Sequence, residues 1–186
     1  MTELIEGILK KTGGKDRSIR WFREKVKELG EVPPQRLIRE GIVTARPTFG
    51  TMNFFMYSPK NKDNVDILPY YDRFPLIIPT DQRGGRFWGI NFHYLPYGLR
   101  VQLFRRMLSF ASDNNFDEKT TINVSWRQIS SIRAVRPSIK SYLFSQVRSA
   151  FLNIRVNEMP VALNLPVQRF VGATDAKVYT DTRKMI

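Results

Sequence analysis

The sequence contains no cysteine, which excludes disulfides, thiol catalysis and zinc sites built on cysteine. It has a single histidine, so a second imidazole is not available as a metal ligand or catalytic partner. No apolar run approaches the roughly 18–20 residues of a membrane-spanning helix, so we expect no membrane contact. The opening residues, MTELIEGILKK, lack the basic start and long apolar centre of a secretory signal. The lack of cysteine suits a reducing cell interior.

Acidic residues are scarce, with 17 Asp and Glu against 30 Lys and Arg, for a net charge of +13. The excess of positive charge is unevenly distributed along the chain. Residues 100–156 carry 10 Lys and Arg against 3 Asp and Glu, whereas residues 51–99 carry 5 against 4. A balance of this kind is typical of a protein with a polyanionic partner or an acidic neighbour in an assembly.

A hydrophobic fraction of 42% and an aromatic fraction of 12% can supply a folded core. The length of 186 residues favours one compact unit. We expect residues 1–41 to form an N-terminal helical segment with helices near residues 2–11 and 19–29. The second of these has one apolar face, made by Ile19, Phe22, Val26 and Leu29.

Residues 42–186 are expected to form an α+β core domain. Between residues 42 and 94, β-branched and aromatic residues bounded by Gly and Pro predict about four short strands. These would make a small antiparallel sheet or an SH3-like barrel, with a turn at Gly84-Gly85.

Helical spacing returns in the basic segment, residues 100–156. One helix is predicted after Pro96, and a short one near Trp126. Another is predicted from Pro137, with an outer stripe formed by Arg136, Lys140, Phe144 and Arg148. The stretches FLNIRV and VALNLP predict a late hairpin. The final residues, DAKVYTDTRKMI, predict a helix or an extended tail.

No pattern of catalytic residues emerges. His93 lies in INFHY, where strand alternation and the absence of a second histidine favour a structural role. The aspartates lie in or beside turns, where they cap backbone groups. Gly84-Gly85 is too short to cradle a phosphate. We therefore expect no catalytic residue, no cofactor and no metal.

The aromatics between Tyr70 and Tyr94 have two interpretations. They could form a platform on which bases stack, or the core of a small sheet. Because a short sheet needs large buried side chains to be stable, the core interpretation is favoured.

The basic residues between 100 and 156 are the strongest physical signal, and most of them are arginine, which binds phosphate and carboxylate with two donors. They predict contacts with DNA or with an acidic protein, and the pattern alone leaves both open. The residues are Arg100, Arg105, Arg106, Arg127, Arg133, Arg136, Lys140 and Arg148.

The order and spacing of FFMYSPKNKD, LPYYDRFPLIIP, FWGINFHYLP and RPSIKSYLFSQVRSAFL resemble a family of small virion proteins from contractile-tailed bacteriophages. The resemblance runs from about Thr44 to the closing VYTDTRKMI. Members are described as DNA end protectors or as virion structural proteins.

The resemblance implies a non-enzymatic component of the phage particle, assembled in the host cytoplasm, that docks onto other virion proteins and lies near packaged double-stranded DNA. Head completion, a neck position or DNA-end protection would fit this expectation, with several copies in the assembly and DNA held through its phosphates. Two alternatives remain, a baseplate or tail component with purely protein contacts and a free nucleic-acid-binding protein.

Overall fold

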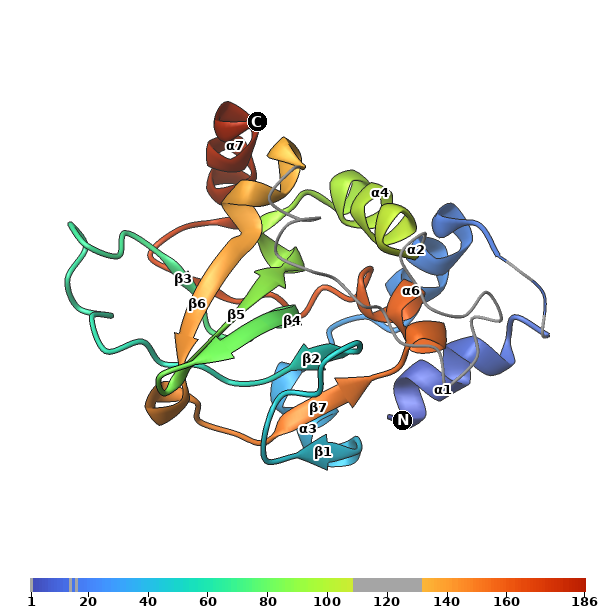
Figure 1. Ribbon diagram of the computed structural model, residues 1–186. Coiled ribbons are helices and arrows are strands. Elements are labelled where there is room, and N and C mark those ends of the chain that lie inside the picture. Colours follow the sequence, from blue (N-terminus) through green and yellow to red (C-terminus); the bar gives the residue numbers. More distant parts are fainter. Residues whose placement is uncertain (1, 14, 16, 109–131) are drawn as a thin grey trace.

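A six-stranded antiparallel sheet forms the centre of the protein (Figure 1). The computed structural model describes residues 2–13, 15, 17–108 and 132–186. The strand order is β1-β7-β2-β4-β5-β6, and a separate pair is formed by β3 and β8. The sheet is open and forms no closed barrel, so the α+β prediction is confirmed and the barrel variant is not. The strands are β1 Val43–Thr44, β2 Met52–Phe54, β3 Tyr71–Asp72, β4 Leu76–Arg83, β5 Arg86–Asn91, β6 Ile139–Leu143, β7 Phe151–Ile154 and β8 Phe170–Val171.

Strands β4 and β5 form the longest hairpin, and its turn is the predicted Gly84-Gly85 pair. Both glycines have positive φ angles, 57° and 78°. Two consecutive left-handed residues match the twist of the flanking strands, and glycine adopts them without steric cost. The predicted antiparallel sheet and its turn are therefore confirmed.

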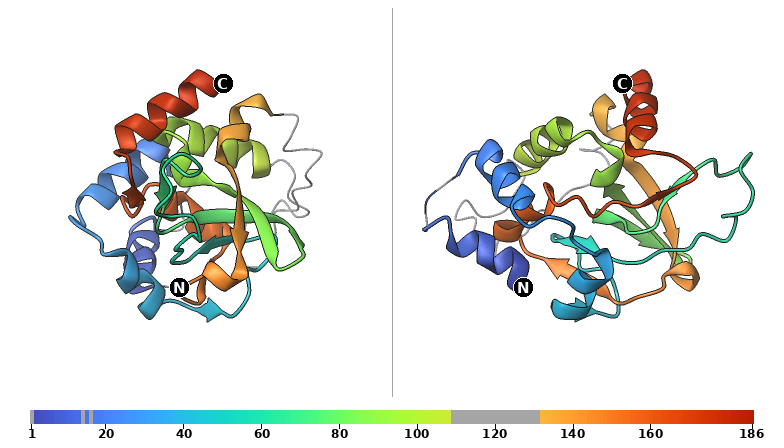
Figure 2. Two further views of the ribbon diagram at one scale, coloured as in Figure 1. Left: turned by 90° about the vertical axis from the view of Figure 1, so that its left-hand side faces the viewer. Right: turned by 180° about the vertical axis from the view of Figure 1, so that it is seen from behind.

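Three N-terminal helices precede the sheet: α1 Glu3–Lys10, α2 Ile19–Lys27 and α3 Pro34–Glu40. The side chain of Thr2 accepts from the Ile5 amide at the start of α1, and Ser18 does the same for Trp21 at the start of α2. These caps satisfy backbone donors that a helix start leaves open. Both helices pack against the short helix α6 (Met159–Ala162), and the right-hand view of Figure 2 shows them at the end of the molecule away from the β4–β5 turn.

Three further segments surround the sheet: the 3-10 helix η1 (Phe92–Tyr94), helix α4 (Tyr97–Leu108) and helix α7 (Asp175–Met185). The predicted helix after Pro96 is α4. The closing segment, for which a helix and a tail were both open, is a helix.

The predicted helix from Pro137 is wrong. The chain forms the 3-10 helix η2 (Arg133–Ser138), then β6, then the 3-10 turn η3 (Phe144–Gln146). Strand β6 pairs with β5 from Ile139 to Leu143, and this ladder satisfies the backbone that a helix would satisfy internally. A spacing of four residues fits one face of a helix, but four is also a multiple of two and fits one face of a strand.

The predicted late hairpin is also wrong. Strand β7 is present, but it pairs with β1 and β2. The second stretch starts in the last two residues of α6 and continues without regular structure. Before α6, the Arg155 amide donates to Glu158 Oε2 at 2.7 Å in a capping interaction. The short helix predicted near Trp126 lies outside the described residues.

The aromatics pack mainly into the interior, as the core interpretation predicts. A compact cluster contains Phe55, Tyr57, Phe87, Tyr142 and Phe151. The rings of Phe55 and Phe151 lie 4.8 Å apart between centroids. Phe74 and Phe92 are buried, whereas Trp88 and Tyr71 are partly exposed at the sheet surface.

Phe92 is fully buried in the main core, so its truncation tests the fold. We expect Phe92→Ala to lower the free energy of unfolding by about 3–5 kcal/mol, because the substitution leaves a cavity among packed neighbours. Trp88→Ala, at the half-buried position, should cost less. Urea denaturation measures both, and equal losses would contradict the burial pattern.

Candidate nucleic-acid interface

His93 belongs to a buried polar network and not to an open site. Its Nδ1 lies 2.7 Å from Asp72 Oδ2, and because a carboxylate only accepts, the imidazole donates through Nδ1. Asn91 Nδ2 donates to the same oxygen and to the hydroxyl of Tyr142, each at 3.1 Å. Burial lowers the pKa of His93 and outweighs the opposing effect of Asp72, so the ring is neutral near pH 7.

The backbone amide of Phe74 also donates to Asp72, at 3.0 Å. The network therefore ties β3 to the end of β5 and to η1. Among the described residues no group of three His, Cys, Asp or Glu side chains could hold a metal ion. None of the described helices is long and apolar enough to cross a membrane.

Arg100 was predicted as a surface contact, but it is fully buried. Its guanidinium donates to the carbonyl oxygens of Leu95 at 2.8 Å, Leu163 at 3.3 Å and His93 at 3.4 Å. It also donates to the hydroxyl of Tyr179 at 2.7 Å. We therefore remove Arg100 from the candidate interface, because its donors are used inside the protein.

The other residues predicted to contact DNA or a partner do not lie together. Arg105 and Arg106 lie on the C-terminal half of α4, whereas Arg133 and Arg136 are exposed on η2. Arg148 follows η3 at the opposite end of the sheet, so it does not share a helical stripe with Arg136. Arg127 lies outside the described residues.

Lys140 is partly buried in β6, with its Nζ 4.0 Å from the centre of the Tyr94 ring. Burial lowers the pKa of Lys140 to about 8. An ammonium group held against an aromatic ring in this way is less available to bind an external phosphate.

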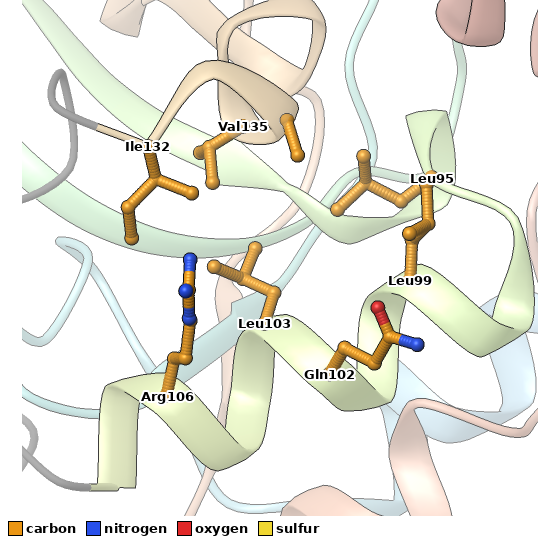
Figure 3. A pocket seen from close by; sticks show the side chains of 8 residues that line it. Leu95, Leu99, Gln102, Leu103, Arg106, Ile132 and Val135 are labelled. Atoms are coloured by element: carbon orange, nitrogen blue, oxygen red, sulfur yellow. The ribbon is translucent and has the colours of Figure 1, made fainter. Parts of the chain in front are cut away.

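Helix α4 and η2 face each other across a small apolar pocket of about 370 Å³, lined by Leu99, Leu103 and Val135 among others. Figure 3 shows Arg106 extending from α4 toward Ile132 beside this pocket. Arg106 already interacts within the protein, so we do not count it as available to a partner.

Exposed cations lie on η2, on α4 and in the described part of the loop between α1 and α2. We call this set of residues the α4 basic surface; within the described part of the chain none of its members forms an ion pair with a carboxylate. In contrast, cations on the N-terminal helices are often paired, as in Lys10 with Glu6 and Arg20 with Glu24. The α4 basic surface consists of Lys15, Arg17, Arg105, Arg133 and Arg136.

A second group of arginines surrounds η3 and the β4–β5 turn, at the other end of the molecule (Figure 1). Arg83 and Arg86 lie directly opposite each other across the hairpin. The guanidinium of Arg46 lies 4.2 Å from the centre of the Phe144 ring. We call Arg46, Arg83, Arg86 and Arg148 the sheet-end arginines. None of them forms an ion pair with a described carboxylate, and like charges placed directly opposite are destabilising without a partner.

Residues 6–184 match a protein family described as the phage T4 terminal DNA protecting protein. This chain belongs to that family. Nearly the whole chain takes part in the match, so it spans the described helices and the sheet. The predicted relationship to DNA end protectors of contractile-tailed phages is confirmed. No curated protein and no solved structure gives a significant match.

Membership of the terminal DNA protecting family identifies a bacteriophage protein whose role is structural and concerns DNA ends. Sequence reasoning found the basic character of α4 and η2. It missed the contributions of Lys15 and Arg17, and of the sheet-end arginines it named only Arg148. Only the composition of the whole chain signalled these residues, because they are far apart in the sequence.

The buried network makes stability depend on pH. Since the pKa of His93 is lowered below its reference value of 6.5, the unfolded chain takes up a proton before the folded protein does. Stability should therefore fall as the pH drops below 6.5, by at most about 1.4 kcal/mol per pH unit from this group. His93→Gln, which does not titrate, should show a shallower fall between pH 6.5 and 5 in urea denaturation. Parallel curves for the two proteins would exclude this role for His93.

Proposed function

We propose that the protein binds the ends of packaged double-stranded DNA through backbone phosphates and shields them, without catalysing a reaction. Membership of the terminal DNA protecting family is the observation that carries the proposal. The α4 basic surface supports it, because its cations are exposed and no described carboxylate neutralises them. Four of its five members are arginine, whose guanidinium can donate two parallel hydrogen bonds to one phosphate.

Binding of this kind is independent of base sequence, since phosphates carry no base identity. That independence suits a protein that has to act on whatever sequence lies at a DNA end. Because each phosphate contact releases condensed counterions, affinity should fall steeply with added salt.

We further propose that the sheet-end arginines dock onto an acidic face of a neighbouring virion protein, at a head-completion or neck position. The supporting observation is the exposed apolar surface that flanks Arg46 along the chain. Ile42, Val43 and Phe49 are large exposed hydrophobic residues on or near β1, which is an edge strand. Arginine and aromatic residues next to apolar surface are typical of protein interfaces, whereas DNA interfaces are more polar. Several copies of the protein would be held in this way.

The DNA proposal predicts the effect of replacing Lys15, Arg17, Arg105, Arg133 and Arg136 together by Gln. Fluorescence anisotropy with linear duplex DNA at several salt concentrations should show weaker binding. The slope of log affinity against log salt should become shallower by about 4.5, since each neutralised phosphate contributes about 0.9. Protection of linear duplex from an exonuclease should fall in parallel.

The matched control replaces the four sheet-end arginines by Gln. It removes a similar charge from the opposite end and should leave the salt slope nearly unchanged. Equal slopes for wild type and the five-residue variant would exclude the α4 basic surface as the DNA site. Failure of the wild-type protein to bind DNA would overturn the DNA function as a whole.

The docking proposal predicts the effect of reversing charge at Arg83 and Arg86. Arg83→Glu with Arg86→Glu should abolish incorporation into phage particles, because like charges would then face each other across the interface. DNA affinity of the purified variant should stay within about twofold of wild type. Mass spectrometry of purified particles from a complementation experiment measures incorporation, and normal incorporation would contradict the proposal.

A further inference from the structure

The connection between β2 and β3, residues 58–70, projects from the molecule. Figure 1 and the right-hand view of Figure 2 both show it extending away from the sheet, from α4 and from α7. Its second half is an ordered turn, in which the Leu68 amide donates to the carbonyl oxygen of Asn64 at 2.9 Å. The Ile67 amide donates to Asn64 Oδ1 at 3.2 Å. We call residues 63–68 the prong.

The prong presents two aliphatic side chains to solvent. Val65 is 67% exposed and Ile67 is 65% exposed, the two highest values among the large hydrophobic residues of the described chain. A single exposed hydrophobic residue is ordinary on a protein surface. Two on one short ordered turn that projects from the body indicate a contact with a partner.

The prong also carries two carboxylates, Asp63 and Asp66. Neither forms an ion pair with a described cation, although the chain has a net charge of +13. The nearest cations in the sequence, Lys60 and Lys62, belong to a separate turn, which is closed by the Lys62 amide and the carbonyl oxygen of Pro59. The prong therefore suits a partner surface that is apolar and positively charged.

This chain itself has such a surface, between the start of α4 and the end of α7. An open pocket of about 420 Å³ has apolar walls that include Pro96, Leu99 and Ile186. A dry cavity of about 150 Å³ holds benzene, so the pocket has room for two branched aliphatic side chains. Arg183 also lines the pocket; it is exposed and forms no ion pair with a described carboxylate. We call this the α4–α7 pocket.

We infer that the prong of one copy of this chain docks in the α4–α7 pocket of a second copy. Its aliphatic side chains lie against the apolar walls, and Asp66 pairs with Arg183. A second copy is favoured as the partner because both complementary halves of the contact are present on this chain.

The contact is head to tail, since the two surfaces differ and the prong points away from its own pocket (Figure 1). Each copy in a pair therefore keeps one surface free, and repetition of the contact gives a ring or an open chain of copies. The inference goes beyond DNA binding and docking onto other virion proteins, because neither of those proposals uses the prong or the α4–α7 pocket.

Trapping by a disulfide tests the contact directly, since the chain has no cysteine of its own. Val65→Cys supplies one thiol. Gly98→Cys supplies the other, because Gly98 lines the pocket and an added Cβ there meets no atom within 4 Å. Mixing the two variants under mild oxidation should give a disulfide between positions 65 and 98, which mass spectrometry of peptides identifies.

The matched control mixes Val65→Cys with Gly7→Cys. Gly7 is another exposed helical glycine at which an added Cβ meets no atom within 4 Å, and it lies on α1, away from the pocket. This mixture should yield far less mixed dimer, because only random collisions bring the two thiols together.

Charge reversal supplies a second readout, in sedimentation velocity over a range of protein concentrations. Wild type should self-associate as its concentration rises. Asp66→Lys and Arg183→Asp should each abolish this association, and the double variant should restore it, because the charges are then exchanged and again opposite. Asp81→Lys makes the same charge change at an exposed position on β4 and should associate as wild type does.

Three results would overturn the inference. The first is a wild type that stays monomeric and a mixed disulfide no more abundant than in the control. The second is association that neither charge reversal weakens, and the third is association that the double variant fails to restore. None of these results bears on DNA binding or on docking through the sheet-end arginines, because those depend on other residues.

Discussion

The buried guanidinium of Arg100 holds together parts of the chain that are distant in sequence. It donates to carbonyl oxygens of η1 and of the segments that follow η1 and α6, and to Tyr179 of α7. Tyr97 lies beneath it, with the guanidinium carbon 4.2 Å from the ring centre. A buried charge is tolerated only when its donors are satisfied, so these segments must meet in one arrangement. The position of α4 depends on this contact.

The adjacent Asp72 network works in the same way. Asp72 accepts from His93, Asn91 and the Phe74 amide, and it thereby fixes the point where β5 passes into η1 and α4. The donors of Arg100 and the oxygens of Asp72 are thus used inside the fold. The exposed cations of the α4 basic surface and of the sheet end have no such role. Their mutual repulsion destabilises the folded chain, and anionic partners that cover them would relieve this repulsion.

The two basic regions lie at opposite ends of the molecule and differ in their surroundings. Three members of the α4 basic surface, Lys15, Arg17 and Arg105, line one cavity. Among the sheet-end arginines, Arg46 lies in the chain between the exposed apolar residues Val43 and Phe49. The proposed function needs this separation, because DNA and a neighbouring subunit would otherwise compete for the same cations.

The sequence was sufficient to predict helices α1 and α2, the Gly84-Gly85 turn, the α+β class, the basic excess and the family. The helix starts and the turn could be predicted because local sterics and hydrogen bonding decide them. That residues 139–143 form a strand could not be predicted, because pairing with β5 outweighed a pattern that fits helix and strand alike. Only the tertiary structure decided that Arg100 is internal while Lys15, Arg17 and Arg105 meet at one cavity. Burial and proximity between distant residues follow from how the elements pack, and spacing along the chain does not contain that information.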